Sequence, residues 1–213
     1  MVKKILKDTL VLCVITFIAG LMLGAVEYIT REPIAQAKIE AKNKAYKEVF
    51  EEADEFKGNE ELDNALNNKT QILKKIGYSH ISIDEGVGAY KGEELIGYVF
   101  SVTTKEGYGG EITLAVGVRM DGTLTGYEIL AIDETPGLGM NAGEKSFKSQ
   151  FENKKIPGIE WTKTGAAKEN EVDAISGATI TTKAVTGAVN GVGAFVTNSD
   201  TGLIIVKEGA DNE

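Results

Sequence analysis

The fold class is decided by residues 112–132, which read ITLAVGVRMDGTLTGYEILAI. From Ile112 to Val118, large apolar side chains alternate with threonine, alanine and glycine, which is typical of a β-strand with one buried face. Asp121-Gly122 is a hairpin signal, and residues 124–132 are apolar enough to return as the partner strand. This stretch therefore predicts an antiparallel hairpin.

Further strands and helices are expected around the hairpin. From about Ile76 apolar residues recur at every second position, as in a β-strand, and residues 95–104 read as another strand. Helices are predicted from about 144 to 151 and from just after Gly177 to about Val196. Helices among antiparallel strands indicate an α+β domain, which we expect at residues 57–199. The acidic residues 200–213 are expected to form a tail.

The N-terminal part reads as a membrane anchor. Residues 9–26 carry no charge, and a helix of that length spans about 27 Å, close to the hydrocarbon thickness of a bilayer. We predict a transmembrane helix at 9–29 after a short tail at 1–8. A cleaved signal peptide is the alternative. The anchor is preferred because the A-x-A-like site at 35–37 lies far beyond the apolar run.

The charges near the span predict its orientation. Lys3, Lys4 and Lys7 crowd the tail, as expected of a cytoplasmic N-terminus. Long domains translocate largely regardless of charge, so the remainder is expected on the extracytoplasmic side of the cell (inner) membrane. Residues 30–56 are expected to form a stalk helix that begins at a Thr30 cap and packs on its own domain. Its apolar stripe recurs every four residues, at Ala37, Ala41, Ala45, Val49 and Ala53.

Composition excludes several classes of function. The 213 residues carry a net charge of -9, which argues against a nucleic-acid partner because phosphate binding needs a basic face. The only cysteine is Cys13, so no disulfide can form within the chain. His80 is the only histidine and is interpreted as structural. No sequence pattern suggests a metal site.

The chemistry is expected in residues 172–182, which read VDAISGATITT. Small residues precede a helix start, where free backbone amides and the helix dipole favour an anion. Gly177 permits close approach or positive φ. Hydroxyl groups of Ser176, Thr179, Thr181 and Thr182 add donors. These residues predict a phosphate site, with a capped helix that binds no ligand as the alternative.

The Ser-Gly-Ala-Thr sequence followed by Ile-Thr resembles the flavinylation motif of FMN-binding domains in the Rnf and Na⁺-translocating NADH:quinone reductase complexes. The resemblance implies that Thr179 is esterified by the phosphate of FMN and that Asp173 is the upstream aspartate of the motif. It also implies attachment by a separate Mg²⁺-dependent flavin transferase that uses FAD. A threonine hydroxyl is a weak nucleophile without a base, and no base stands in the motif.

Two further segments carry the same resemblance. Residues 134–139, ETPGLG, resemble the family's loop beside the flavin, and residues 107–110, GYGG, resemble its glycine turn, although Glu111 stands where a proline is common in some relatives. The cofactor-binding residues that the resemblance implies come from all three segments. They are Tyr108, Gly109, Glu134, Thr135, Pro136, Gly137, Leu138, Gly139, Asp173, Ser176, Gly177, Ala178, Thr179, Thr181 and Thr182.

The resemblance implies an electron-transfer subunit of an Rnf-type ion-translocating ferredoxin:NAD⁺ oxidoreductase, with the other membrane and peripheral subunits of the complex as partners. The compact length is closer to the G subunit of that complex than to the longer C subunit of the quinone reductase. That C subunit, or another membrane reductase with an FMN domain, is the close alternative. A tethered binding domain without redox chemistry and a free-standing flavoenzyme are the distant ones. No catalytic side chains of its own are evident.

Overall fold

The computed structural model describes residues 2–203. The chain forms two units, Met1–Ala41 and Lys42–Glu213. The α+β class predicted from the sequence is confirmed. Of the tail expected at 200–213, residues 204–213 lie outside the described part of the chain.

The chain begins with one long helix, α1 (Val2–Val49). Its apolar part is long and apolar enough to cross a membrane, and none of that part is buried. The expected cap at Thr30 is wrong, because the Thr30 hydroxyl donates to the Val26 carbonyl at 2.8 Å within the helix. Pro33 lies inside α1 and, having no N–H, omits one hydrogen bond without ending the helix.

The core of the second unit is a five-stranded antiparallel sheet whose strands follow chain order. The predicted hairpin at Asp121-Gly122 joins its last two strands and is confirmed. The five strands are β1 (Glu55–Lys57), β2 (Ile81–Lys91), β3 (Glu94–Thr104), β4 (Ile112–Arg119) and β5 (Leu124–Ile132).

Helices and a second, small sheet complete the unit. The parallel pair β6–β7 was not anticipated from the sequence. The segment expected at 144–151 forms a short α-helix followed by a 3-10 turn. In chain order these elements are α2 (Glu60–Asn67), α3 (Lys69–Lys75), η1 (Gly139–Gly143), α4 (Lys145–Lys148), η2 (Ser149–Phe151), β6 (Glu160–Thr162), β7 (Glu171–Asp173), α5 (Thr179–Val196) and η3 (Ser199–Thr201).

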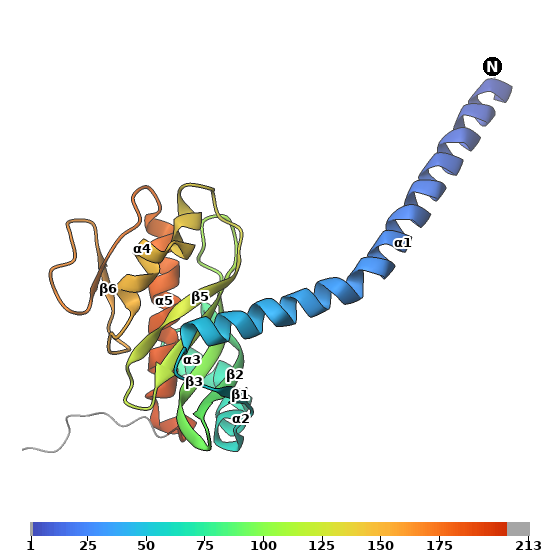
Figure 1. The fold of residues 1–213 in the computed structure, drawn as a ribbon. Helices are drawn as coiled ribbons and strands as arrows, with labels where there is room; N and C mark the ends of the chain where they lie inside the picture. Colours follow the sequence, from blue (N-terminus) through green and yellow to red (C-terminus); the bar gives the residue numbers. More distant parts are fainter. Residues whose placement is uncertain (1, 204–213) are drawn as a thin grey trace, which may run out of the picture. The chain divides into compact units, whose positions relative to one another are not determined.

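Both faces of the large sheet are covered. On one face α5 runs along the strands (Figure 1), with the Phe195 ring packed edge-on to Phe100 at 6.1 Å between centroids. On the other face the end of α1 buries Ala45, Tyr46 and Val49 in a separate apolar cluster. Strand β4, predicted to be half-buried, is therefore buried on both sides, because the packing of α1 supplies the second cover.

Small residues in the sheet allow the end of α1 to pack against its second face. At Gly97 in β3, a Cβ atom would overlap the Val118 carbonyl oxygen of β4 and lie 2.6 Å from the Phe50 ring. Ala89 and Ala115 lie in the same cluster as the end of α1. Small side chains on three neighbouring strands thus let the helix end approach the sheet closely.

Replacing either of two buried tyrosines by phenylalanine is expected to change the stability of the fold, but in opposite directions. The Tyr127 hydroxyl donates to the Ala142 carbonyl at 2.6 Å in the core. Tyr127→Phe leaves that carbonyl unpaired, which is expected to cost about 1–3 kcal/mol. The equally buried Tyr98 hydroxyl has no partner among residues 2–203, so Tyr98→Phe is expected to be neutral or to stabilise by up to about 1 kcal/mol. Thermal unfolding of the detergent-solubilised chain, followed by Trp161 fluorescence, measures both.

The same hydroxyls predict loss of stability at alkaline pH. Burial raises the pKa of Tyr98 to about 12 and raises the pKa of Tyr127 well above its usual range. A raised pKa in the folded state contributes stability that is complete below the unfolded value near 10 and is lost as pH rises toward the folded value. The unfolding temperature is expected to fall above about pH 10, and less steeply in Tyr98→Phe. Equal slopes in the two proteins would contradict the burial argument for Tyr98.

Candidate functional site

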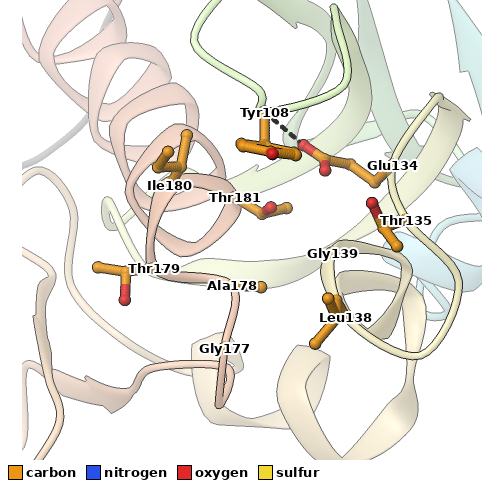
Figure 2. A pocket seen from close by; sticks show the side chains of 10 residues that line it. All are labelled: Tyr108, Glu134, Thr135, Leu138, Gly139, Gly177, Ala178, Thr179, Ile180 and Thr181. Carbon is orange, nitrogen blue, oxygen red and sulfur yellow. Dashed lines mark hydrogen bonds between the residues drawn. The ribbon is translucent and has the colours of Figure 1, made fainter.

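A cavity of about 590 Å³ opens at the start of α5. Its volume lies in the range of small-molecule sites. Three segments that are far apart in the sequence line it, and Figure 2 shows their side chains around one space. The lining residues are Tyr108, Glu134, Thr135, Leu138, Gly139, Gly177, Ala178, Thr179, Ile180 and Thr181.

The first wall is the turn into α5. Thr179 is the first residue of the helix and is half-buried. Gly177 has φ +75°, which favours glycine. The first backbone hydrogen bond of the helix runs from the Thr182 amide to the Ala178 carbonyl at 3.0 Å. The amides of the three residues between are therefore the free first-turn donors that favour an anion.

Thr182 holds this turn together. Its hydroxyl donates to the Ala178 carbonyl at 3.0 Å and accepts a hydrogen bond from the Ile175 amide at 3.0 Å. The residue is completely buried and lies outside the cavity wall. The sequence predicted a hydroxyl that faces the ligand, whereas the structure commits it to the backbone that shapes the helix start.

The second wall is the loop that follows β5. Its turn is closed by hydrogen bonds from the Leu138 and Met140 amides to the Thr135 carbonyl, at 3.1 and 3.3 Å. Gly137 adopts φ +74° at the tip. Thr135 and Leu138 face the cavity, whereas Pro136 and Gly137 lie on the exposed outside of the turn.

The third wall is the glycine turn at 107–110. A Cβ atom on Gly109 would overlap the Asp133 carbonyl oxygen, so glycine is required where this turn crosses the loop after β5. The Tyr108 amide donates to the Glu134 carboxylate at 2.7 Å, drawn as a dashed line in Figure 2. Gly109 does not line the cavity, but its lack of a side chain brings Tyr108 to it.

Exposed apolar side chains gather at the mouth. Within residues 42–203, the large apolar side chains that are exposed are Tyr108, Leu138, Met140 and Ile180. Tyr108 is 69% exposed, Ile180 50% and Leu138 42%, and these three line the cavity. Grouped apolar exposure of this kind marks a binding surface. Ile180 was missed from the sequence, where the only signal is an apolar residue directly after Thr179.

Two residues of the 172–182 segment lie outside the cavity wall. Ser176 is exposed beside it. Asp173 is exposed in β7, where its carboxylate accepts a hydrogen bond from the Ala166 amide at 2.6 Å. Its own amide donates to the Gln150 side chain at 2.6 Å. Asp173 faces a second, smaller cavity of about 370 Å³.

Thr181 and Thr182 are adjacent, but replacing each by valine is expected to lower the free energy of unfolding by different amounts. Thr182→Val leaves the buried Ile175 amide without its acceptor and is expected to cost about 1–3 kcal/mol. Thr181 is also buried, yet its hydroxyl faces the cavity and makes no hydrogen bond within residues 2–203, so Thr181→Val is expected to change stability by less than about 1 kcal/mol. Thermal unfolding of both variants checks the difference, and equal losses would contradict it.

Comparison with known proteins places this cavity in a family. Over 178 residues the chain is 35% identical to the G subunit of the proton-translocating ferredoxin:NAD(+) oxidoreductase complex of Clostridium ljungdahlii, covering 84% of each protein. This chain belongs to the family of these G subunits. It is also 33% identical over 193 residues to the G subunit of the Na(+)-translocating ferredoxin:NAD(+) oxidoreductase complex of Acetobacterium woodii, covering 88% of this chain and 89% of the relative.

A family model described as an FMN-binding domain matches residues 107–192 of this chain. That range contains all three cavity walls. Among solved structures, NqrC of Shewanella oneidensis matches with 23% identity and a TM-score of 0.44, covering 49% of this chain and 52% of that chain.

The residues present fit FMN. The cofactor combines a flat apolar ring with an anionic phosphate. The cavity combines an apolar mouth with the free amides of a helix start, and no carboxylate from the helix start faces it. Thr179 and Glu134 lie on opposite sides in the view of Figure 2, so the one lining carboxylate is kept apart from the free amides of the helix start.

Proposed function

We propose that this chain is a membrane-anchored electron-transfer subunit of an ion-translocating ferredoxin:NAD⁺ oxidoreductase and carries FMN joined through its phosphate to Thr179. The observation that supports the proposal most strongly is the position of Thr179. It is the first residue of α5, in the wall of a cavity with an apolar mouth. The relatives' names, which describe subunits of such complexes, support the assignment of the complex.

Each wall of the cavity has a part in holding FMN. Thr179 binds the phosphate, and the first-turn amides of α5 stabilise its remaining charge. Tyr108, Leu138 and Ile180 would offer apolar surface to the ring. When bound, FMN supplies a centre that accepts and releases one or two electrons. Because the mouth is open, a covalent bond also prevents loss of the cofactor.

The ester is made by another protein. Within the described residues, no side chain that could act as a base hydrogen-bonds the Thr179 hydroxyl. We therefore propose a separate Mg²⁺-dependent flavin transferase. The Thr179 oxygen bonds to the FMN phosphorus of FAD, the bond from that phosphorus to AMP breaks, and the proton goes to a base of the transferase. Asp173, which is exposed outside the cavity wall, is assigned to recognition by this enzyme.

The anchoring of the chain is part of the proposal. We infer that residues 9–29 cross the membrane and that residues 1–8 lie in the cytoplasm. The rest of α1, which ends at Val49 and not at 56 as expected, and the FMN domain, whose first strand is β1 (Glu55–Lys57), then lie on the extracytoplasmic side. The basic residues of the tail and the apolar run that follows support this orientation. Protease added to intact spheroplasts is expected to cut the domain, whereas protection there and cleavage in inverted vesicles would reverse the orientation.

The function is tested on the full chain produced together with a flavin transferase. The purified protein is expected to be yellow, and its denatured band is expected to fluoresce in a gel, because an ester survives denaturation. A colourless protein would contradict the redox role. A yellow protein whose flavin is released by denaturation would contradict the covalent bond alone.

A further inference from the structure

Glu134 is a buried carboxylate with no cationic partner. Its exposure is 7%. None of the ion pairs found among residues 2–203 includes it. Burying a charge without a partner is costly, so a fold that keeps one beside a ligand cavity has a use for it.

The carboxylate joins two walls of the cavity. One oxygen accepts the hydrogen bond from the Tyr108 amide at 2.7 Å. The other faces Gly139, where an added Cβ atom would lie 2.5 Å from it, and on the first side an added Cβ at Gly107 would lie 3.1 Å away. Glycines on both sides thus leave room for the carboxylate. The loop after β5 and the glycine turn are built around this one group.

We propose that Glu134 is a positioning residue with two effects: it fixes Tyr108 at the cavity mouth through the Tyr108 amide, and its buried negative charge lowers the reduction potential of the bound FMN. The second effect rests on the proposed function. Adding electrons to a ring beside a fixed negative charge is unfavourable, and a buried charge such as Glu134 is screened less than an exposed one. The hydrogen bond accounts for the position of Tyr108, and the charge accounts for the potential.

The positioning effect is tested without any cofactor. In full-length protein made without the transferase and labelled with ¹⁵N-tyrosine, the Tyr108 amide signal is identified by its absence in Tyr108→Phe. A hydrogen bond to a carboxylate moves that signal downfield. Glu134→Ala is expected to move it upfield, and Glu134→Gln, which keeps an acceptor oxygen, by less. The matched control is Asp133→Asn, which neutralises the exposed neighbouring carboxylate and is expected to leave the signal in place. An unmoved signal in Glu134→Ala overturns the positioning effect.

The charge effect is tested by redox titration of flavin-loaded protein. At a fixed solution potential, Glu134→Gln is expected to raise the ratio of reduced to oxidised flavin on the order of tenfold. Asp133→Asn is expected to change it by less than about twofold, since exposed charges are screened. Equal shifts in the two variants, a shift of the opposite sign, or failure of Glu134→Gln to load flavin overturns the charge effect. Absence of flavin from the wild-type chain would instead contradict the proposed function and leave the amide test decisive for positioning.

Discussion

Thr179→Val is expected to abolish covalent flavin completely, so that the variant produced with the transferase shows no fluorescent band after denaturation. Valine keeps the branched shape of threonine at the first position of α5 and removes the oxygen that forms the ester. The loss is therefore chemical and leaves the fold intact. Unfolding temperatures of the two proteins without flavin are expected to agree within a few degrees.

The control variants separate Thr179 from the other hydroxyls nearby. Thr181→Val, in the same cavity wall, and Ser176→Ala, outside it, are expected to keep a fluorescent band. Thr179→Ser restores an oxygen at the same place and is expected to restore at least part of the fluorescence. A band in Thr179→Val as intense as that of the wild type would rule out Thr179 as the attachment site.

Gly97→Ala is expected to destabilise the protein more than any other single added methyl group in the sheet. The expected loss in the free energy of unfolding is about 3 kcal/mol or more. The added methyl would overlap the Val118 carbonyl oxygen and press on the Phe50 ring. The Val118 carbonyl cannot move freely because it belongs to the paired strands β3 and β4. The Phe50 ring cannot move freely because it is buried.

Gly58→Ala is the matched control, since a Cβ atom there meets nothing within 4 Å. It is expected to change stability by less than about 0.5 kcal/mol. Trp161 fluorescence during thermal unfolding in detergent measures both variants. A Gly97→Ala protein that unfolds together with Gly58→Ala would show that the Val118 carbonyl and the Phe50 ring do not crowd Gly97 as closely as described.

Much of the fold was predictable because its signals are local. The alternation from Ile112 to Val118 and the Asp121-Gly122 turn define a hairpin within twenty-one residues. The small residues before Thr179 likewise mark a helix start, and α5 begins there. Burial of β4 on both faces was not predictable, because it depends on the end of α1, which is distant in sequence. The parallel pair β6–β7 has three residues in each strand, too few for a periodic pattern.

The candidate site, like the fold, was predictable from the sequence only in part. A motif resemblance selects residues by their order in the chain, so it grouped Thr182 and Asp173 with those that face the cavity. Their hydrogen bonds show that Thr182 shapes the turn and that the Asp173 carboxylate binds the Ala166 amide, outside the cavity wall. The contact between Glu134 and the Tyr108 amide joins residues 26 apart. No pattern in the sequence indicates that contact, whereas the folded chain displays it directly.

Thr179 can be tested most directly with the protein from its native membrane. Trypsin is expected to release residues 169–183, ENEVDAISGATITTK, which carry every hydroxyl of the helix start. Mass spectrometry with fragmentation is expected to find this peptide heavier by one FMN less one water, with the addition on Thr179. An unmodified peptide, or an addition placed on Ser176, Thr181 or Thr182, would contradict the account.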